Sequence, residues 1–182
     1  SFYAIWTIDP LATTNSLLNT DSITSSKIVL RGSANSKGNQ SPNGFFRYSK
    51  SQTFASGVST TTPQSIGDNI DVTLTEVEVT SGIESATIYY FSAGVEAGAT
   101  GKRKTKYGDT KTILTLPVAP SNLTLTLNGT SGTLTFDSQT KGSNVTITYH
   151  VTCSATGQTS ITASGTDTSF SLTGFVPGSE YT

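Results

Sequence analysis

Cysteine, histidine and methionine are nearly absent from this chain of 182 residues, which has one Cys, one His and no Met. A single cysteine excludes an internal disulfide, and one Cys with one His cannot build a closed zinc site. A lone histidine also leaves little for general acid–base catalysis. No set of residues points to catalysis, to a metal or to a cofactor, and we predict that the protein is not an enzyme.

Charge is scarce as well, because 13% of residues are charged and the formal net charge is −1. So weak a field does not attract nucleic acid, and no apolar run is long enough to span a bilayer. The one basic cluster is Lys102, Arg103, Lys104 and Lys106. Such a run is typical of a solvated hairpin tip or of an edge strand guarded against aggregation, rather than of a site for an acidic ligand.

The remaining polar candidates for chemistry have structural interpretations. Cys153 is expected to be a small buried residue on a strand, and His150 is expected to face outward because it alternates with its apolar neighbours. The acidic run at 68–71 lacks the spacing of an EF-hand calcium loop. The acids available for glycoside hydrolysis are spread along predicted strands and turns: Glu76, Glu78, Glu84 and Glu96.

Ser, Thr, Gly and Asn make up much of the chain, and its apolar residues alternate with a period of two rather than with a helical period. Turn residues interrupt these runs every eight to twelve positions, as in β-sandwiches. Strands are predicted at 1–9, 27–34, 44–50, 70–79, 86–98, 104–117, 122–128, 132–137, 143–153, 158–164 and 168–175. The fold class is therefore predicted to be all-β.

Three segments are predicted along the chain. Residues 1–22 hold a strand that ends at Pro10, followed by a linker or irregular crossing over 10–22. A first sandwich occupies 23–117, and a second begins after the proline-containing linker at 118–120 and occupies 118–182. Because the chain starts at Ser1 without methionine, we expect a mature or excised segment of a longer precursor.

The end of the second sandwich resembles the fibronectin type III family, in which a Leu-x-x-Leu-x-Pro-Gly-x-x-Tyr stretch joins two strands. Phe136 stands where the family places a tryptophan, and Tyr149 with Val151 matches its Tyr-x-Val. The residues of the joining stretch are Leu172, Phe175, Pro177, Gly178 and Tyr181. The resemblance implies two consecutive immunoglobulin-like or fibronectin type III-like β-sandwiches, as in repeats of a microbial cell-surface or extracellular protein.

In that family the tyrosine forms a corner, with its hydroxyl bonded to the preceding backbone. The resemblance gives this role to Tyr181, and Tyr89 is the expected counterpart in the first sandwich. A sandwich of this family needs two further strands after the tyrosine, so the second sandwich is predicted to be incomplete within this chain. Either the chain is part of a longer array, or another copy completes the sandwich.

Residues 1–9 are a candidate donated strand, because they are apolar on both faces. Phe2, Ala4, Trp6 and Ile8 share one of these faces. Donated to a neighbouring copy, this strand would complete the open sandwich, and a head-to-tail contact of this kind propagates into a filament. The expected partners are therefore copies of the same chain or further modules of it.

Four Asn-x-Ser/Thr tripeptides mark candidate N-glycosylation sites, and glycans are therefore candidate partners as well. Their asparagines are Asn39, Asn122, Asn128 and Asn144. Three of the four fall in the second sandwich, at predicted strand ends or turns.

Three functions are consistent with these features. The leading hypothesis is a structural or adhesive protein of an extracellular or cell-surface assembly, such as a filament. The alternatives are a spacer or accessory module of a secreted polysaccharide-active enzyme and a decoration domain on a phage or virion. The sandwich scaffold alone does not separate them, because it hosts unrelated binding roles.

Overall fold

The computed structural model describes residues 9–15, 23–68 and 70–182, and every regular element in these residues is a β-strand. The prediction of an all-β chain is confirmed. The chain divides into two compact units, Ser1–Leu116 and Pro117–Thr182, each with its own hydrophobic core. The candidate donated strand, with Phe2, Ala4, Trp6 and Ile8, lies outside the described residues.

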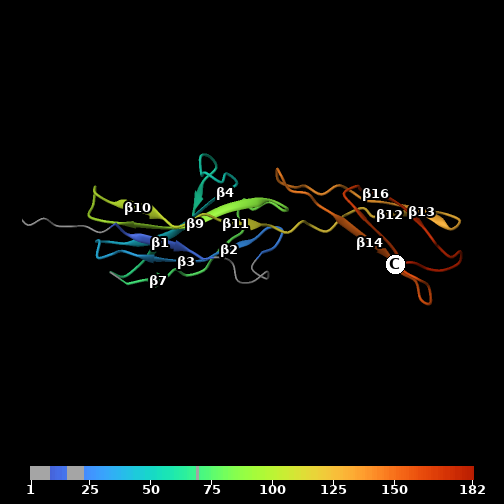
Figure 1. Ribbon diagram of the computed structural model, residues 1–182, viewed down its shortest axis with the longest axis horizontal. Helices are drawn as coiled ribbons and strands as arrows, with labels where there is room; N and C mark the ends of the chain where they lie inside the picture. The colour runs from blue at the N-terminus through green and yellow to red at the C-terminus, as the bar shows by residue number, and fades with distance from the viewer. Residues whose placement is uncertain (1–8, 16–22, 69) are drawn as a thin grey trace, which may run out of the picture. The chain divides into compact units, whose positions relative to one another are not determined.

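Unit 1 is a sandwich of two antiparallel layers (Figure 1). One layer holds β1, β3 and β7, extended by the β2–β8 pair; the other has the order β10-β9-β4-β5, with β11 on β9 and β6 on β4. The strands are β1 (Leu11–Thr14), β2 (Ile28–Leu30), β3 (Gly32–Asn35), β4 (Asn43–Ser49), β5 (Ser59–Thr60), β6 (Gln64–Ser65), β7 (Val72–Thr73), β8 (Val77–Val79), β9 (Ile88–Ala97), β10 (Lys104–Tyr107) and β11 (Lys111–Leu114).

The core of unit 1 is built on the alternation of β4 and β9, which pair from Asn43↔Glu96 to Ser49↔Tyr90. Phe46 and Phe91 point into the core and are fully buried. Burial of each such side chain contributes about 1.5–3 kcal/mol. Strand β9 therefore pairs with β4 and also contributes side chains to the core.

The predicted linker at 10–22 is wrong over Leu11–Thr14, which form β1 and pair with β3. Proline at the residue before a strand removes no ladder hydrogen bond, so Pro10 is compatible with the start of β1 at the next residue. Thr14 is buried although it is polar, because its hydroxyl accepts the N–H of Ala93 on β9 (2.9 Å). Because Thr14 is buried by a hydrogen bond to the opposite layer, the pattern of apolar residues in the sequence does not predict its burial.

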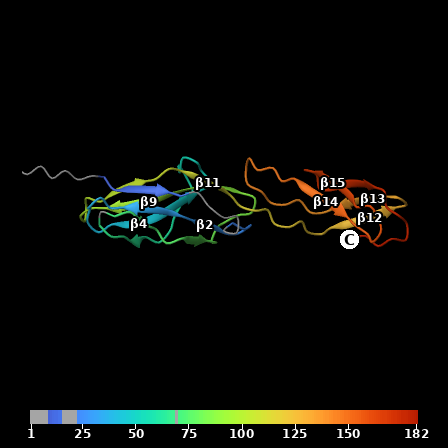
Figure 2. The same cartoon turned by 60° about the horizontal axis from the view of Figure 1, so that its bottom comes forward.

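Unit 2 has five strands in two layers, of order β12-β13-β16 and β14-β15 (Figure 2). The strands are β12 (Thr124–Asn128), β13 (Ser131–Thr135), β14 (Tyr149–Cys153), β15 (Ile161–Gly165) and β16 (Ser169–Thr173). Between the layers, the Phe136 ring stacks on Phe170 at 6.1 Å and meets Tyr149 edge-on at 4.7 Å. The core of unit 2 therefore depends on aromatic contacts.

The strand predicted at 143–153 is shorter in the structure, where β14 covers only Tyr149–Cys153. Asn144 adopts a left-handed backbone conformation, with a φ of 62°, which interrupts an extended run. The apolar alternation continues through Val145 and Ile147, but their backbone belongs to the loop before β14.

Candidate functional site

The two tyrosines singled out by the sequence make the same kind of contact in the two units. The Tyr89 hydroxyl accepts the N–H of Glu84 at 2.9 Å and donates to the Gly82 carbonyl at 3.1 Å. The Tyr181 hydroxyl accepts the N–H of Val176 at 3.1 Å, and its ring meets Phe175 edge-on at 4.9 Å. In both units the bonded N–H lies five residues before the tyrosine.

The residue after each tyrosine pairs with a residue at or just after the end of a neighbouring strand. In unit 1, Tyr90 pairs with Ser49 at the end of β4. In unit 2, Ser154 and Thr182 exchange both of their backbone hydrogen bonds, each at 2.9 Å. Thr182 therefore lies beside the end of β14, on the edge opposite β15.

The backbone of β14 is ready to extend this pairing. In an antiparallel ladder both polar groups of one residue point to the same side, and successive residues alternate. Because the groups of Ser154 reach Thr182, those of Thr152 and His150 face the same edge. Among the described residues no strand lies along this edge.

An apolar groove of about 480 Å³ lies beside this edge within unit 2. Its walls are the core-facing side chains of β14 together with the chain that leads into β12. Leu123 in that wall is 61% exposed. The groove is lined by Pro117, Val118, Pro120, Leu123, Leu125, Leu134, Phe136, Tyr181, Thr182 and residues 147–153.

Two residues that enzymatic chemistry would need lie on opposite faces of β14. Cys153 faces the core, and burial raises the pKa of its thiol, so that it is an inert neutral side chain. The His150 side chain is exposed on the outer face. The groove therefore offers apolar surface and backbone hydrogen-bonding groups rather than a nucleophile and a base.

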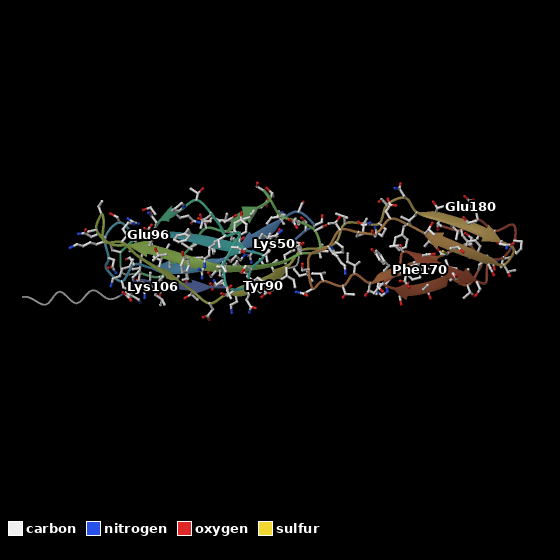
Figure 3. The ribbon with its side chains drawn as sticks, turned by 90° about the horizontal axis from the view of Figure 1, so that it is seen from above. Lys50, Tyr90, Glu96, Lys106, Phe170 and Glu180 are labelled. Atoms are coloured by element: carbon white, nitrogen blue, oxygen red, sulfur yellow. The ribbon has the colours of Figure 1, made fainter. Side chains whose placement is uncertain are left out.

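The exposed edge of unit 1 is protected in a way that the edge of β14 is not. On β10, Lys104 and Lys106 each bind the Asp9 carboxylate at 2.8 Å (Lys106 and Glu96 are labelled in Figure 3). Their hydrogen bonds hold the pKa of Asp9 at about 2. Arg103 binds Glu96 at 3.0 Å. Three members of the predicted basic cluster thus form ion pairs, as expected of a guarded edge.

The described residues give no sign of a metal site or a membrane span. Within 9–15, 23–68 and 70–182, no three His, Cys, Asp or Glu side chains come together as metal ligands. Asp71 accepts a hydrogen bond from Asn35 at 3.2 Å. In the same part of the chain, no helix has the length and apolarity that crossing a membrane requires.

The four sequon asparagines differ in whether their amide nitrogen is engaged. Asn39 donates to the Ser36 carbonyl at 2.6 Å, and Asn122 donates to the Asp137 carboxylate at 2.5 Å. Asn128 ends β12 at a hairpin, and Asn144 lies in the loop before β14. Both of these side chains are exposed to solvent.

Sequence reasoning identified β14 and Tyr181 but missed the groove wall at 117–125. The apolar residues of that wall occur in a segment interpreted only as a linker and a strand. The combination of Pro117, Val118 and Leu123 was the available signal, because so many apolar residues in a linker are unusual. The Ser154–Thr182 pairing had no sequence signal, since it consists of backbone atoms alone.

Comparison with known families agrees with this geometry. Residues 118–182 match the family model of the fibronectin type III domain, which covers the whole of unit 2 except Pro117. Domains of this family are typically non-catalytic structural or adhesive modules, common in extracellular and surface proteins. Comparison with curated proteins gives no match.

Proposed function

We propose that this protein is a structural subunit of an extracellular or cell-surface assembly, in which copies join head to tail by adding a strand to unit 2. The observation that carries the proposal is the free edge of β14 with the apolar groove beside it. The backbone of β14 would hydrogen-bond the added strand, and the groove would bury its alternate side chains.

Within the described part of the chain, the edge of β14 has none of the devices that prevent unwanted pairing. Natural proteins protect exposed edges with Lys, Pro, bulges or a covering segment. Unit 1 uses the Lys104 and Lys106 pair, whereas β14 reads Tyr-His-Val-Thr-Cys and has neither Lys nor Pro. An unprotected strand edge next to the exposed Leu123 supports the proposal that a strand of another chain binds along β14.

The chemistry of the groove favours a structural role over a catalytic one. Its lining is mainly aliphatic and aromatic, and the one histidine of the chain presents its side chain on the outer face. A contact between two different surfaces of identical copies does not close on itself, so repeated strand addition produces a filament.

A proline at Thr152 tests the proposal. Thr152→Pro removes an N–H that points to the free edge and leaves the ladder with β15 intact, so the single chain should still fold. In an assembly β14 becomes a central strand, where proline is not tolerated. We expect the wild-type chain to form polymers and Thr152→Pro to remain monomeric, measured by light scattering and electron microscopy.

Thr152→Ala is the matched control, because it changes the same side chain and keeps the N–H. It should assemble like the wild type. Circular dichroism of the Thr152→Pro monomer verifies that unit 2 remains folded. A wild-type chain that stays monomeric at high concentration, or a proline variant that polymerises normally, overturns the proposal.

A further inference from the structure

Unit 1 contains a template for the strand that unit 2 lacks. Tyr89 and Tyr181 make the same kind of contact in their units. The residue after each pairs at the end of a neighbouring strand, Tyr90 with Ser49 at the end of β4 and Thr182 with Ser154 just after β14. The missing strand should therefore lie along β14 as β9 lies along β4.

The template defines what the added strand must present. On β9, Phe91 stands opposite Tyr48, Ala93 opposite Phe46, and Val95 opposite Gly44. Ser154 in unit 2 corresponds to Ser49 in unit 1, because each pairs with the residue after the tyrosine. The positions on β14 that correspond to Tyr48, Phe46 and Gly44 are then Cys153, Val151 and Tyr149. All three line the groove. Side chains directly opposite one another share a face, so three alternate apolar residues are needed there.

The amino-terminal sequence of the chain has this pattern. Strand β9 reads Phe-Ser-Ala-Gly-Val-Glu-Ala over 91–97, and residues 2–8 read Phe-Tyr-Ala-Ile-Trp-Thr-Ile. Both have Phe, then Ala, then two further apolar residues at alternate positions. Continued after Tyr181 and Thr182, Phe2 takes the place that Phe91 takes after Tyr89 and Tyr90.

Resting on the strand addition proposed above, we infer that residues 2–8 of a second copy complete unit 2, running antiparallel to β14. Phe2 stands opposite Cys153, Ala4 opposite Val151, and Trp6 opposite Tyr149. Ile8 then reaches the part of the groove lined by Ile147. Ser1 falls at the position that Thr182 already occupies, so pairing of the donated segment begins at Phe2.

We assign the donor role to another copy, because the chain enters unit 1 at one end of the sandwich and leaves it for unit 2 at the other. Asp9 is held at the β10 end of unit 1 by Lys104 and Lys106, near the Lys104↔Ala97 pair. The chain leaves unit 1 after Leu114, which pairs with Ile88 at the other end of β9. That strand alone spans about 30 Å. Eight extended residues span at most about 27 Å, which is less than the length of β9.

The single cysteine of the chain makes the register testable by disulfide trapping. Because Ser154 and Thr182 form a hydrogen-bonded pair, the position opposite Cys153 is a non-hydrogen-bonded one, with Cα atoms about 4.5 Å apart. A disulfide accommodates Cα separations of about 4.4–6.8 Å. Phe2→Cys in the full chain, oxidised with oxidised glutathione, should therefore link copies into a covalent ladder on a non-reducing gel.

Tyr3→Cys is the matched control, because its side chain faces away from the groove in this register and should give no ladder. Phe2→Cys with Cys153→Ser should also lose the ladder. Since Phe2→Cys removes a buried ring, a second pair keeps Phe2: Ala4→Cys with Val151→Cys and Cys153→Ser should link copies in the same way.

The outcomes distinguish donation by residues 2–8 from the proposed strand addition in general. Ladders from both designed pairs and none from the controls support the donated segment and its register. Polymers that form normally but give no ladder, or give equal linking by Tyr3→Cys, overturn the inference and leave strand addition standing. A wild-type chain that never polymerises overturns the proposed function itself.

Discussion

In each unit a tyrosine hydroxyl forms a hydrogen bond to the backbone of the loop that precedes the tyrosine. The Tyr89 hydroxyl serves two backbone groups in a half-buried setting, whereas the Tyr181 hydroxyl serves one exposed N–H. A hydrogen bond contributes more when its loss leaves a buried partner unsatisfied, because the desolvation of that partner is then uncompensated. The tyrosine hydroxyl should therefore contribute more to the free energy of unfolding in unit 1 than in unit 2.

Removing each hydroxyl should show this difference. Tyr89→Phe leaves the Glu84 N–H unpaired and is expected to lower the free energy of unfolding of unit 1 by about 1–3 kcal/mol. Tyr181→Phe is expected to cost unit 2 about 0.5–1 kcal/mol, since water can replace the hydroxyl. Urea denaturation measures both changes. Tyr107→Phe is the control for a half-exposed ring, and an effect there as large as that of Tyr89→Phe would contradict this account.

The engagement of side-chain amides also predicts where glycans attach. If the native source glycosylates this chain, we expect Asn128 and Asn144 to carry sugars, because their side chains are exposed at a hairpin and in a loop. Asn39 and Asn122 should be less occupied, since their amides already donate hydrogen bonds. Glycopeptide mass spectrometry of the native protein measures the occupancy, and the reverse order would contradict the expectation.

At the scale of elements, the alternating pattern predicted most strands but not how they pair. The runs at 27–34, 44–50 and 86–98 lie over β2 with β3, over β4 and over β9. The pattern missed β1, because Thr14 is buried by a hydrogen bond to Ala93 rather than by its own apolarity. It overextended β14, because a backbone turn at Asn144 does not disturb the alternation of side chains.

Which strands lie at the edge of a sheet could not be predicted from the sequence either. From sequence, the segments 104–117 and 143–153 are both predicted as strands, without the order of their neighbours. The structure gives the first an ion-paired partner in Asp9 and leaves the second with one residue paired on its outer edge. Edge status depends on which strands lie adjacent, which no local pattern records.

The whole molecule contains two separate cores of unequal size. Among the residues that the structure describes, unit 1 buries fourteen clustered apolar side chains and unit 2 buries seven. Because stability follows the apolar area removed from water, unit 2 of the single chain should be the weaker of the two. Completion of its sandwich would supply the missing burial, so its stability should be linked to assembly.

Calorimetry should therefore resolve two unfolding transitions in the monomeric Thr152→Pro chain, with unit 2 unfolding at the lower temperature. In the polymer, the lower transition should rise while that of unit 1 stays, because only unit 2 gains contacts. Adding Tyr89→Phe identifies the transition of unit 1, since it should move that transition alone. A single transition that shifts as a whole on assembly would contradict two independent cores.

The sequence by itself determined that the chain is all-β and indicated its division into two units. Composition and alternating apolar residues carry this information locally, and so does the motif that ends in Tyr181. Only the tertiary structure decided that no described strand lies along the outer edge of β14, that Thr182 pairs with Ser154 there, and that a groove lies beside it. Those features arise from backbone hydrogen bonds and from surfaces assembled out of distant segments, which side-chain patterns do not encode.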